Sequence, residues 1–251
     1  MEKHRATSTT AALLAAWLCL WAPSAWPAVE DDASDWESDW DLEERIAAVN
    51  EGELRFVSRE AAADHHLHHN RIRIDRASLR GGWVLLEQCH ERLDAVPAAQ
   101  ILFNPQRIRG LRVQSAEGIG GAWVEGHSVQ LRDLGRQARL CINGESRALR
   151  HLGEGRYRLQ NGPYMRRFLD GYYPMGVVLE IRYPADALRL ERPHPDPQPG
   201  FEVRGGDGEV LVEAAFEGRL ITCIDFLTPG ATPATSAAPP CPQDADPISL
   251  K

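Results

Sequence analysis

The run His65–His69 places four histidines in five positions of this 251-residue chain. Neutral imidazole is a good ligand for zinc and copper. If the run is a strand, His66 and His68 project from one face, about 7 Å apart by the rise per residue of a strand. If it is a helix, the two ends of the run form the pair instead. With His90 in an expected neighbouring strand, the pattern predicts a candidate copper or zinc site at His66, His68 and His90.

A simpler interpretation of the same run is an exposed loop or strand end in which histidines are tolerated. His68 continues into the alternating face of Ile72 and Ile74, which favours a partly buried, hydrogen-bonded side chain. No second metal-binding motif follows along the chain. Both interpretations stay open, and the sequence indicates no cofactor other than copper or zinc.

The segment 161–175 joins two expected strands and concentrates arginine with aromatic residues. Tyrosine and arginine are enriched at the energetic centres of binding surfaces. Arginine beside aromatic rings also suits acidic or sugar ligands. The alternative is a structural plug whose arginines pair with acidic side chains. The expected partner-facing surface consists of Tyr164, Arg166, Arg167, Tyr172 and Tyr173.

The motifs of common enzymes are missing from the sequence. Cys89 and His90 are adjacent on an expected strand, so their side chains point to opposite faces and cannot form a nucleophile–base pair. The segment Gly126–Gln130 lacks the final glycine of a nucleophile elbow. Phosphate-binding glycine loops, HExxH and EF-hand spacings do not occur. The sequence therefore favours a protein without catalytic activity.

The first 28 residues have the order of a secretory signal peptide. Lys3 and Arg5 precede an apolar run, Ala11–Ala22, and a stretch of small residues and prolines follows. The apolar run is shorter than the roughly 20 residues that a membrane span needs. We expect a mature N-terminus between Ala25 and Val29, no transmembrane span in the mature chain, and export to the periplasm or the extracellular space.

The cysteines agree with an oxidising compartment. Cys19 leaves with the expected signal peptide, and an even number remains. Two disulfides allow three pairings. We favour Cys89–Cys141 and Cys223–Cys241, because each pair keeps to one region of the chain. Buried free thiols are the alternative.

The charge of the chain limits its partners. Its net charge is −8, and cleavage of residues 1–28 would remove two basic and one acidic residue, leaving −9. A protein this acidic has no general attraction for nucleic acid or for an anionic membrane surface. We therefore expect an envelope protein or a glycan as the partner, and no nucleic acid.

The elements that must position these residues are strands. From Leu54 onward the hydrophobic period is two, and Arg71–Asp75 alternates charged and β-branched residues without exception. Asn143-Gly144 and Asp207-Gly208 are typical of two-residue hairpin turns. This pattern predicts an all-β fold, with two small β-sandwich-like domains or one continuous sandwich, a short N-terminal helical leader and a disordered C-terminal tail. The expected division is 1–28 signal peptide, 29–52 acidic leader with a short helix, 53–150 first β domain, 151–228 second β domain and 229–251 disordered tail.

Two functions follow from these patterns. The first is an exported, non-catalytic β-sandwich protein of the cell envelope that acts by binding. The alternative is a periplasmic copper- or zinc-binding protein that uses the run His65–His69.

Overall fold

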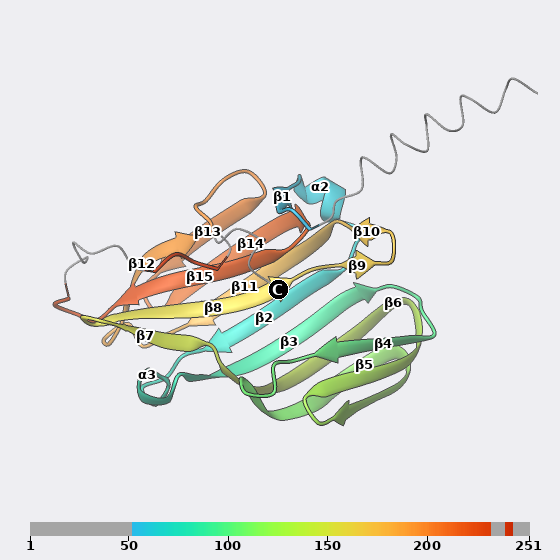
Figure 1. Ribbon diagram of the computed structural model, residues 1–251, viewed down its shortest axis with the longest axis horizontal. Coiled ribbons are helices and arrows are strands. Elements are labelled where there is room, and N and C mark those ends of the chain that lie inside the picture. Colours follow the sequence, from blue (N-terminus) through green and yellow to red (C-terminus); the bar gives the residue numbers. More distant parts are fainter. Residues whose placement is uncertain (1–51, 232–238, 243–251) are drawn as a thin grey trace, which may run out of the picture. The chain divides into compact units, whose positions relative to one another are not determined.

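The computed structural model describes residues 52–231 and 239–242, and this part of the chain is mostly strand (Figure 1). The helices within it are single turns, α2 (Arg59–Ala62) and α3 (Ser78–Gly81). The expected all-β fold is confirmed. The expected signal peptide and helical leader, and most of the expected tail, lie outside the described residues.

The larger of the sheets contains nine strands. Its central path runs β1–β14–β11–β2–β3–β6–β4, while β13 pairs with β14 and β5 pairs with β6. Neighbours are antiparallel except β2 and β11, which are parallel. The bounds are β1 (Arg55–Phe56), β2 (Leu67–Arg73), β3 (Trp83–Leu93), β4 (Ala98–Leu102), β5 (Ile108–Glu125), β6 (Ser128–Arg147), β11 (Met175–Arg182), β13 (Phe201–Gly206) and β14 (Glu209–Glu217).

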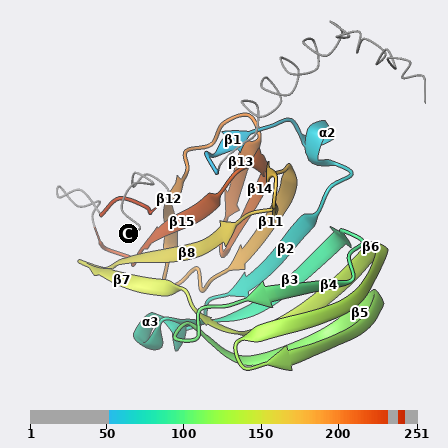
Figure 2. The same ribbon diagram turned by 45° about the vertical axis from the view of Figure 1, so that its right-hand side comes forward.

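A four-stranded sheet of order β12–β15–β8–β7 faces the larger one across the main core (Figure 2). A small hairpin, β9–β10, projects from the connection between β8 and β11. The bounds are β7 (Leu149–Gly153), β8 (Arg156–Tyr164), β9 (Arg167–Phe168), β10 (Gly171–Tyr172), β12 (Arg189–His194) and β15 (Leu220–Leu227).

Strand alternation explains the main core. On β11, Val177, Leu179 and Ile181 are buried, whereas Glu180 and Arg182 point to the outer face. On the smaller sheet every side chain of β15 is buried. The strand lies between β12 and β8. One of its faces packs against the main core, and the segment 239–242 lies near the other face, to which Cys241 is joined. The largest fully buried side chains include Phe201, Phe216, Phe226, Leu159 and Leu220.

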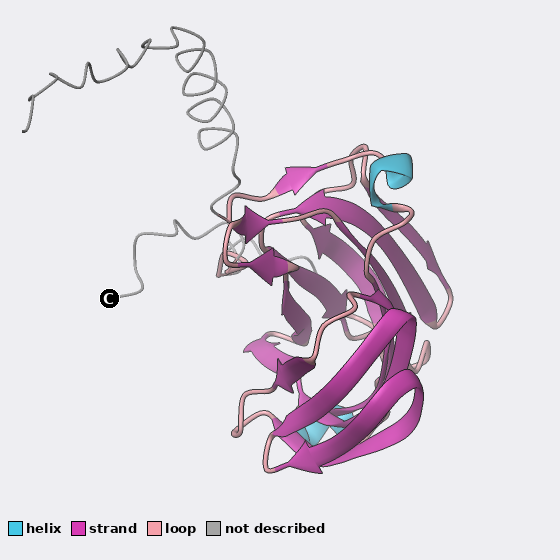
Figure 3. Cartoon of the chain, turned by 90° about the vertical axis from the view of Figure 1, so that its right-hand side faces the viewer, coloured by secondary structure: helices cyan, strands magenta, loops and turns pink. Residues whose placement is uncertain are grey.

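A second apolar cluster lies where the long β5–β6 hairpin curves away from the main core (Figure 3). Both β3 and β4 pair with the same edge of β6, β3 with residues 138–147 and β4 with residues 128–132. Three irregularities in the β5–β6 register accompany this bend, because a bulge bends the strand that carries it. The cluster is centred on Val129, Leu131, Leu140 and Ile142.

The two expected hairpin turns had different outcomes. Asp207-Gly208 joins β13 to β14 as expected, with Gly208 at φ +81°. The turn expected at Asn143-Gly144 is wrong, because both residues continue β6 and pair with β3. A Cβ on Gly144 would lie 3.1 Å from the carbonyl oxygen of Arg109. The absence of a side chain at this glycine therefore allows the backbones of β5 and β6 to approach closely. The true turn between β5 and β6 is at Gly126-His127.

The expected division into two β domains near residue 150 is not confirmed. Strands β11 and β14, from the second half of the chain, belong to the same sheet as β2 and β3, from the first half. The interface between β2 and β11 runs over seven residue pairs, from Leu67 opposite Gly176 to Arg73 opposite Arg182. Residues on both sides of the expected boundary therefore share one sheet.

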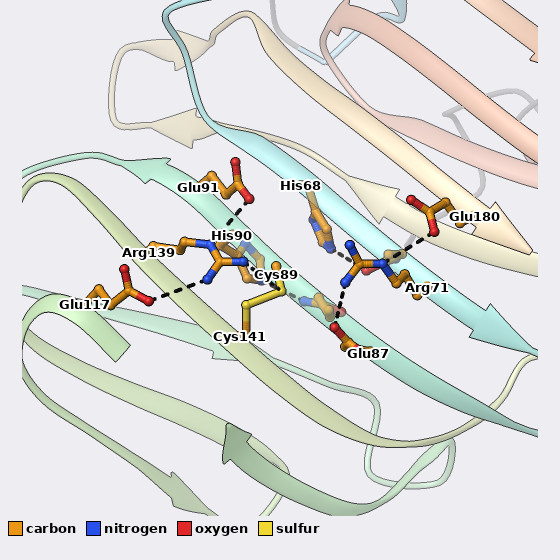
Figure 4. The surroundings of a disulfide bond; sticks show 12 residues. His68, Arg71, Glu87, Cys89, His90, Glu91, Glu117, Arg139, Cys141 and Glu180 are labelled. Atoms are coloured by element: carbon orange, nitrogen blue, oxygen red, sulfur yellow. Dashed lines mark hydrogen bonds and ion pairs between the residues drawn. A yellow bond between two sulfur atoms is a disulfide. The ribbon is translucent and has the colours of Figure 1, made fainter. Parts of the chain in front are cut away.

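Both favoured disulfides are present. Cys89 and Cys141 face each other on β3 and β6, on the outer, charged face of the larger sheet. Around them Arg139 pairs with Glu91 and Glu117, as Figure 4 shows. Cys223, on β15, is joined to Cys241 in the segment 239–242.

Peptide mapping under non-reducing conditions should recover two linked peptide pairs, Cys89 with Cys141 and Cys223 with Cys241. Alkylation before reduction should label none of these four cysteines, because each thiol is consumed in a bond. Mass spectrometry of protein from an exporting host measures this disulfide pairing. A linked pair that contains Cys89 and Cys223 would contradict the fold as described.

Candidate functional site

Near one end of the main core, the inward-facing side chains change from apolar to polar. Strands β2 and β3 are antiparallel neighbours, so their inward positions meet in pairs. Tyr164, at the end of β8 on the opposite sheet, faces the same region. The inward pairs along β2 and β3 are Ile72 with Leu86, Asn70 with Gln88, and His68 with His90.

His66, just before β2, joins this polar group through a chain of hydrogen bonds. The amide nitrogen of Gln88 donates to Nε2 of His90 over 2.7 Å, and Nδ1 of His90 lies 2.9 Å from Nε2 of His66. Because the amide nitrogen of Gln88 can only donate, Nε2 of His90 accepts, and the proton of the neutral His90 ring is on Nδ1, from which it is donated to His66. Both rings are then neutral, and each has its facing nitrogen engaged in this chain.

A second chain links the two sheets. Nε2 of His68 lies 2.9 Å from Oδ1 of Asn70 and donates to it, and Nδ2 of Asn70 donates to the hydroxyl of Tyr164 over 2.7 Å. The Tyr164 ring packs edge-on against His68, with centroids 4.9 Å apart. Tyr164 was expected on a binding surface, and this expectation is wrong: it is only 3 % exposed. The alternation of β8 turns its ring between the sheets, where Asn70 satisfies its hydroxyl.

Burial holds the histidines neutral. It lowers the pKa of His66 to about 4, although the negative charge of Asp94 opposes this shift; the positive charges of Arg166 and Arg92 add to it. Burial lowers the pKa of His68 to about 3 and that of His90 well below its usual range, because a charged imidazole loses its hydration there and repels its neighbours. Burial also raises the pKa of the Tyr164 hydroxyl above its usual range.

The three histidines expected to hold a metal are brought together, with ring centroids 4.4 to 6.2 Å apart (Figure 4 shows His68 and His90 on neighbouring strands). Their rings pack against one another, and the nitrogens named above are engaged in hydrogen bonds. Among the described residues, no group of three or more His, Cys, Asp or Glu side chains is arranged to hold a metal ion. The geometry favours a buried polar network, and the copper or zinc alternative is not favoured.

After Tyr164, the chain leaves β8 and forms the β9–β10 hairpin. Arg166, between β8 and β9, donates to both oxygens of Asp94 over 2.8 and 3.1 Å, and its side chain is only 13 % exposed. The hydrogen bonds from Arg166 lower the pKa of the Asp94 carboxyl. Arg166 therefore anchors the base of the hairpin to the segment after β3 and cannot be counted as a free surface cation.

In the hairpin, arginine guanidinium groups lie against aromatic rings, and Arg167 is the exposed one of the two arginines. The guanidinium of Arg167 lies 5.5 Å from the ring centre of Tyr172, and that of Arg166 lies 5.4 Å from Tyr173. Tyr173 meets Phe168 edge-on, with centroids 5.5 Å apart. Leu169, at the tip, is fully exposed. Of the expected surface residues, Arg167 and Tyr172 thus contact each other, and Tyr173 lies in a separate group with Phe168 and Arg166.

Sequence reasoning missed the apolar tip, Phe168 and Leu169, and the anchor Asp94. A signal for the tip was present, because Asp170-Gly171 is a turn dipeptide and two large apolar residues precede it. Large apolar residues placed at a turn are exposed by the geometry of the turn. Asp94 had no local signal, since it lies 72 residues from Arg166.

The sequence matches no protein family and no curated protein. Among residues 52–231 and 239–242, no helix is both long enough and apolar enough to cross a membrane.

Proposed function

We propose that this chain is an exported, non-catalytic binding protein of the cell envelope, and that the β9–β10 hairpin contacts a protein partner. One observation carries the proposal. Of the six large apolar side chains that are exposed among the described residues, three fall in the five positions 165–169: Met165, Phe168 and Leu169. Exposed apolar side chains that gather in one place mark interaction sites.

The hairpin has the build of a preformed anchor. Its base is held by the bidentate pair of Arg166 with Asp94, and its rings are held by contacts with one another. A segment that is ordered before binding loses little conformational entropy when the partner arrives. The exported setting is supported by the two disulfides, which are typical of oxidising compartments.

The chemistry of the tip selects a protein over a glycan as the partner. Leu169 offers only an aliphatic surface and projects from the molecule, so it fits an apolar groove and gains nothing from sugar hydroxyls. Arg167, exposed beside it, adds a positive charge to the rim of the contact. We therefore expect an apolar groove with carboxylates on its rim in the partner.

A photo-crosslinking amino acid at Asp170, next to the tip, should give one discrete protein adduct in intact exporting cells. Leu169→Asp should reduce that adduct at least tenfold, because a charge at the tip cannot enter an apolar groove. The same substitution should change the free energy of unfolding by no more than about 0.5 kcal/mol, as at other exposed sites. Adduct yield is read by mass-resolved blotting, and stability by urea denaturation.

Leu102→Asp is the matched control, because Leu102 is an exposed leucine on β4, away from the hairpin. It should leave the adduct intact. Equal loss with Leu102→Asp, or the absence of any protein adduct, would overturn the proposal. Binding of the wild-type protein to vesicles of phosphatidylcholine and phosphatidylglycerol that Leu169→Asp abolishes would replace the protein partner with a membrane surface.

A further inference from the structure

A cavity of about 550 Å³ opens where the chain crosses from the larger sheet to the smaller one. Strand β6 ends at Arg147 and β7 begins at Leu149, so a single residue separates the two sheets here. Helix α3 and the segment before β5 close the other sides of the cavity. It lies at the α3–β7 end of the molecule, whereas the β9–β10 hairpin lies at the opposite end (Figure 1). This cavity therefore belongs to a different site.

All the charged side chains that line the cavity are positive. Four arginines line it: Arg80, Arg107, Arg147 and Arg150. Its lining of described residues includes no aspartate or glutamate, and none of the four guanidinium groups forms an ion pair with a described carboxylate. In a chain with 36 acidic and 28 basic residues, composition does not explain such a gathering.

Two of these arginines, Arg107 and Arg150, repel each other. Burial and the positive charge of Arg150 lower the pKa of Arg107 below its usual range. Like charges held together without a counter-charge destabilise the fold, so their placement calls for a ligand that supplies the negative charge.

The cavity wall is held in place by the backbone. The backbone N–H of Arg147 donates to the carbonyl oxygen of Arg107 over 3.0 Å, and Nε of Arg107 donates back to the carbonyl oxygen of Arg147 over 3.2 Å. Leu149 donates to the carbonyl of Gly82 over 3.1 Å and ties α3 to β7. The site is therefore largely formed before any ligand binds.

We propose that this arginine cavity binds a sugar-sized ligand that carries two or more phosphate or sulfate groups. Guanidinium forks match tetrahedral oxyanions with paired hydrogen bonds. Four cations exceed what a single oxyanion needs. The ring of Tyr157, packed 4.9 Å from that of His151, gives the cavity an aromatic wall for the body of the ligand. The volume lies in the range of small-molecule sites, about 300–1,000 Å³.

Isothermal titration calorimetry at low ionic strength tests the proposal with three probes: fructose 1,6-bisphosphate, a trisulfated heparin disaccharide and inorganic pyrophosphate. We expect one site per chain for at least one of the two sugar probes, and no heat from fructose itself. Tighter binding of the bisphosphate or of the disaccharide tells whether phosphate or sulfate is preferred. Binding of pyrophosphate as tight as that of the sugars would contradict the part assigned to Tyr157.

The variant Arg80→Gln with Arg150→Gln should weaken binding of the sugar probe at least tenfold. It leaves no described carboxylate without its cation, so we expect an unchanged or higher melting temperature. Arg73→Gln with Arg182→Gln is the matched control. It removes the same charge from another cavity, which also contains Glu87, Glu145 and Glu180, and should change binding less than twofold.

Phenylglyoxal labelling of the wild-type protein gives a second measurement that needs no variant. A bound sugar probe should protect Arg107 and Arg150 from modification and leave Arg73 reactive. Equal weakening by both double variants would show a general charge effect and overturn the site. Failure of all three probes to bind at 5 mM would overturn it as well.

Discussion

The free energy of unfolding should fall steeply as the pH drops from 6.5 to 4.5, at a rate that rises from about 2 kcal/mol per pH unit at pH 6.5 to about 4 kcal/mol per pH unit near pH 5. Three histidines that the fold holds neutral cause this fall: His68 and His90 are buried, and His66 is half-buried. In the fold, burial lowers the pKa of His66 to about 4, that of His68 to about 3, and that of His90 well below its usual range. In the unfolded chain, histidine has a pKa of about 6.5.

The sign follows from proton uptake. Below pH 6.5 the unfolded chain binds three protons that the fold excludes, so each acid step favours unfolding. Each histidine contributes about 1.4 kcal/mol per pH unit. The stability is fully present above pH 6.5 and is lost as the pH falls toward 4. Over two units the loss approaches the whole stability of an ordinary domain, about 5–15 kcal/mol. The lowered pKa of Asp94 acts in the same direction, but only below the pKa of an ordinary carboxyl.

Urea denaturation at a series of pH values measures the slope. His66→Gln should reduce it by about one third, because one of the three excluded protons disappears while the glutamine side chain still accepts from His90. His127→Gln is the control, since His127 is exposed at the turn between β5 and β6, and it should leave the slope unchanged. A slope in His66→Gln equal to that in His127→Gln would show that His66 is not held neutral in the core.

Asp225→Ala should cost about 3–5 kcal/mol of stability, because it removes the carboxylate that neutralises a buried cation. Asp225, on β15, accepts from Nε and Nη2 of Arg158 on β8, over 2.7 and 2.8 Å. The two side chains are only 5 % and 4 % exposed. Arg158 also donates to the carbonyl of Pro239 over 2.5 Å, so the pair supports the segment that Cys241 tethers.

Asp196→Ala is the matched control, because its ion pair with Arg192 is 57–65 % exposed, and exposed pairs contribute at most about 1 kcal/mol. Combining Arg158→Met with Asp225→Leu should recover most of the loss, since no charge then stays buried. Chemical denaturation of the three variants gives the comparison. A loss below about 1 kcal/mol in Asp225→Ala would contradict the buried ion pair.

Several features of the fold could be predicted from local sequence. The alternation in Arg71–Asp75 identified the buried and exposed faces of β2, because the side-chain period of a strand is two. Asp207-Gly208 identified a turn, because its backbone conformation is a local property. The favoured disulfide pairing, which keeps each bond within one region of the chain, is the one present.

Other features depended on neighbours distant in sequence. Asn143-Gly144 has the same local preference for a turn as Asp207-Gly208, yet pairing with β3 on one edge and the close approach of β5 on the other keep it extended. Tyr164 was expected on the surface from its arginine neighbours, but its side of β8 faces Asn70 across the core. A local pattern cannot show which strand lies opposite.

The candidate sites also combine features that the local sequence predicts with features that depend on distant neighbours. The sequence by itself determined the all-β class and the proximity of His66 to His68, because period and proximity along the chain are local properties. It favoured the cysteine pairing that the structure contains but left other pairings open. Only the tertiary structure decided that these histidines stack with His90 in a buried network, since burial depends on the opposite sheet. The same holds for the arginine cavity. Its cations come from α3, the segment before β5, β6 and β7, and only the crossing between the two sheets brings them together.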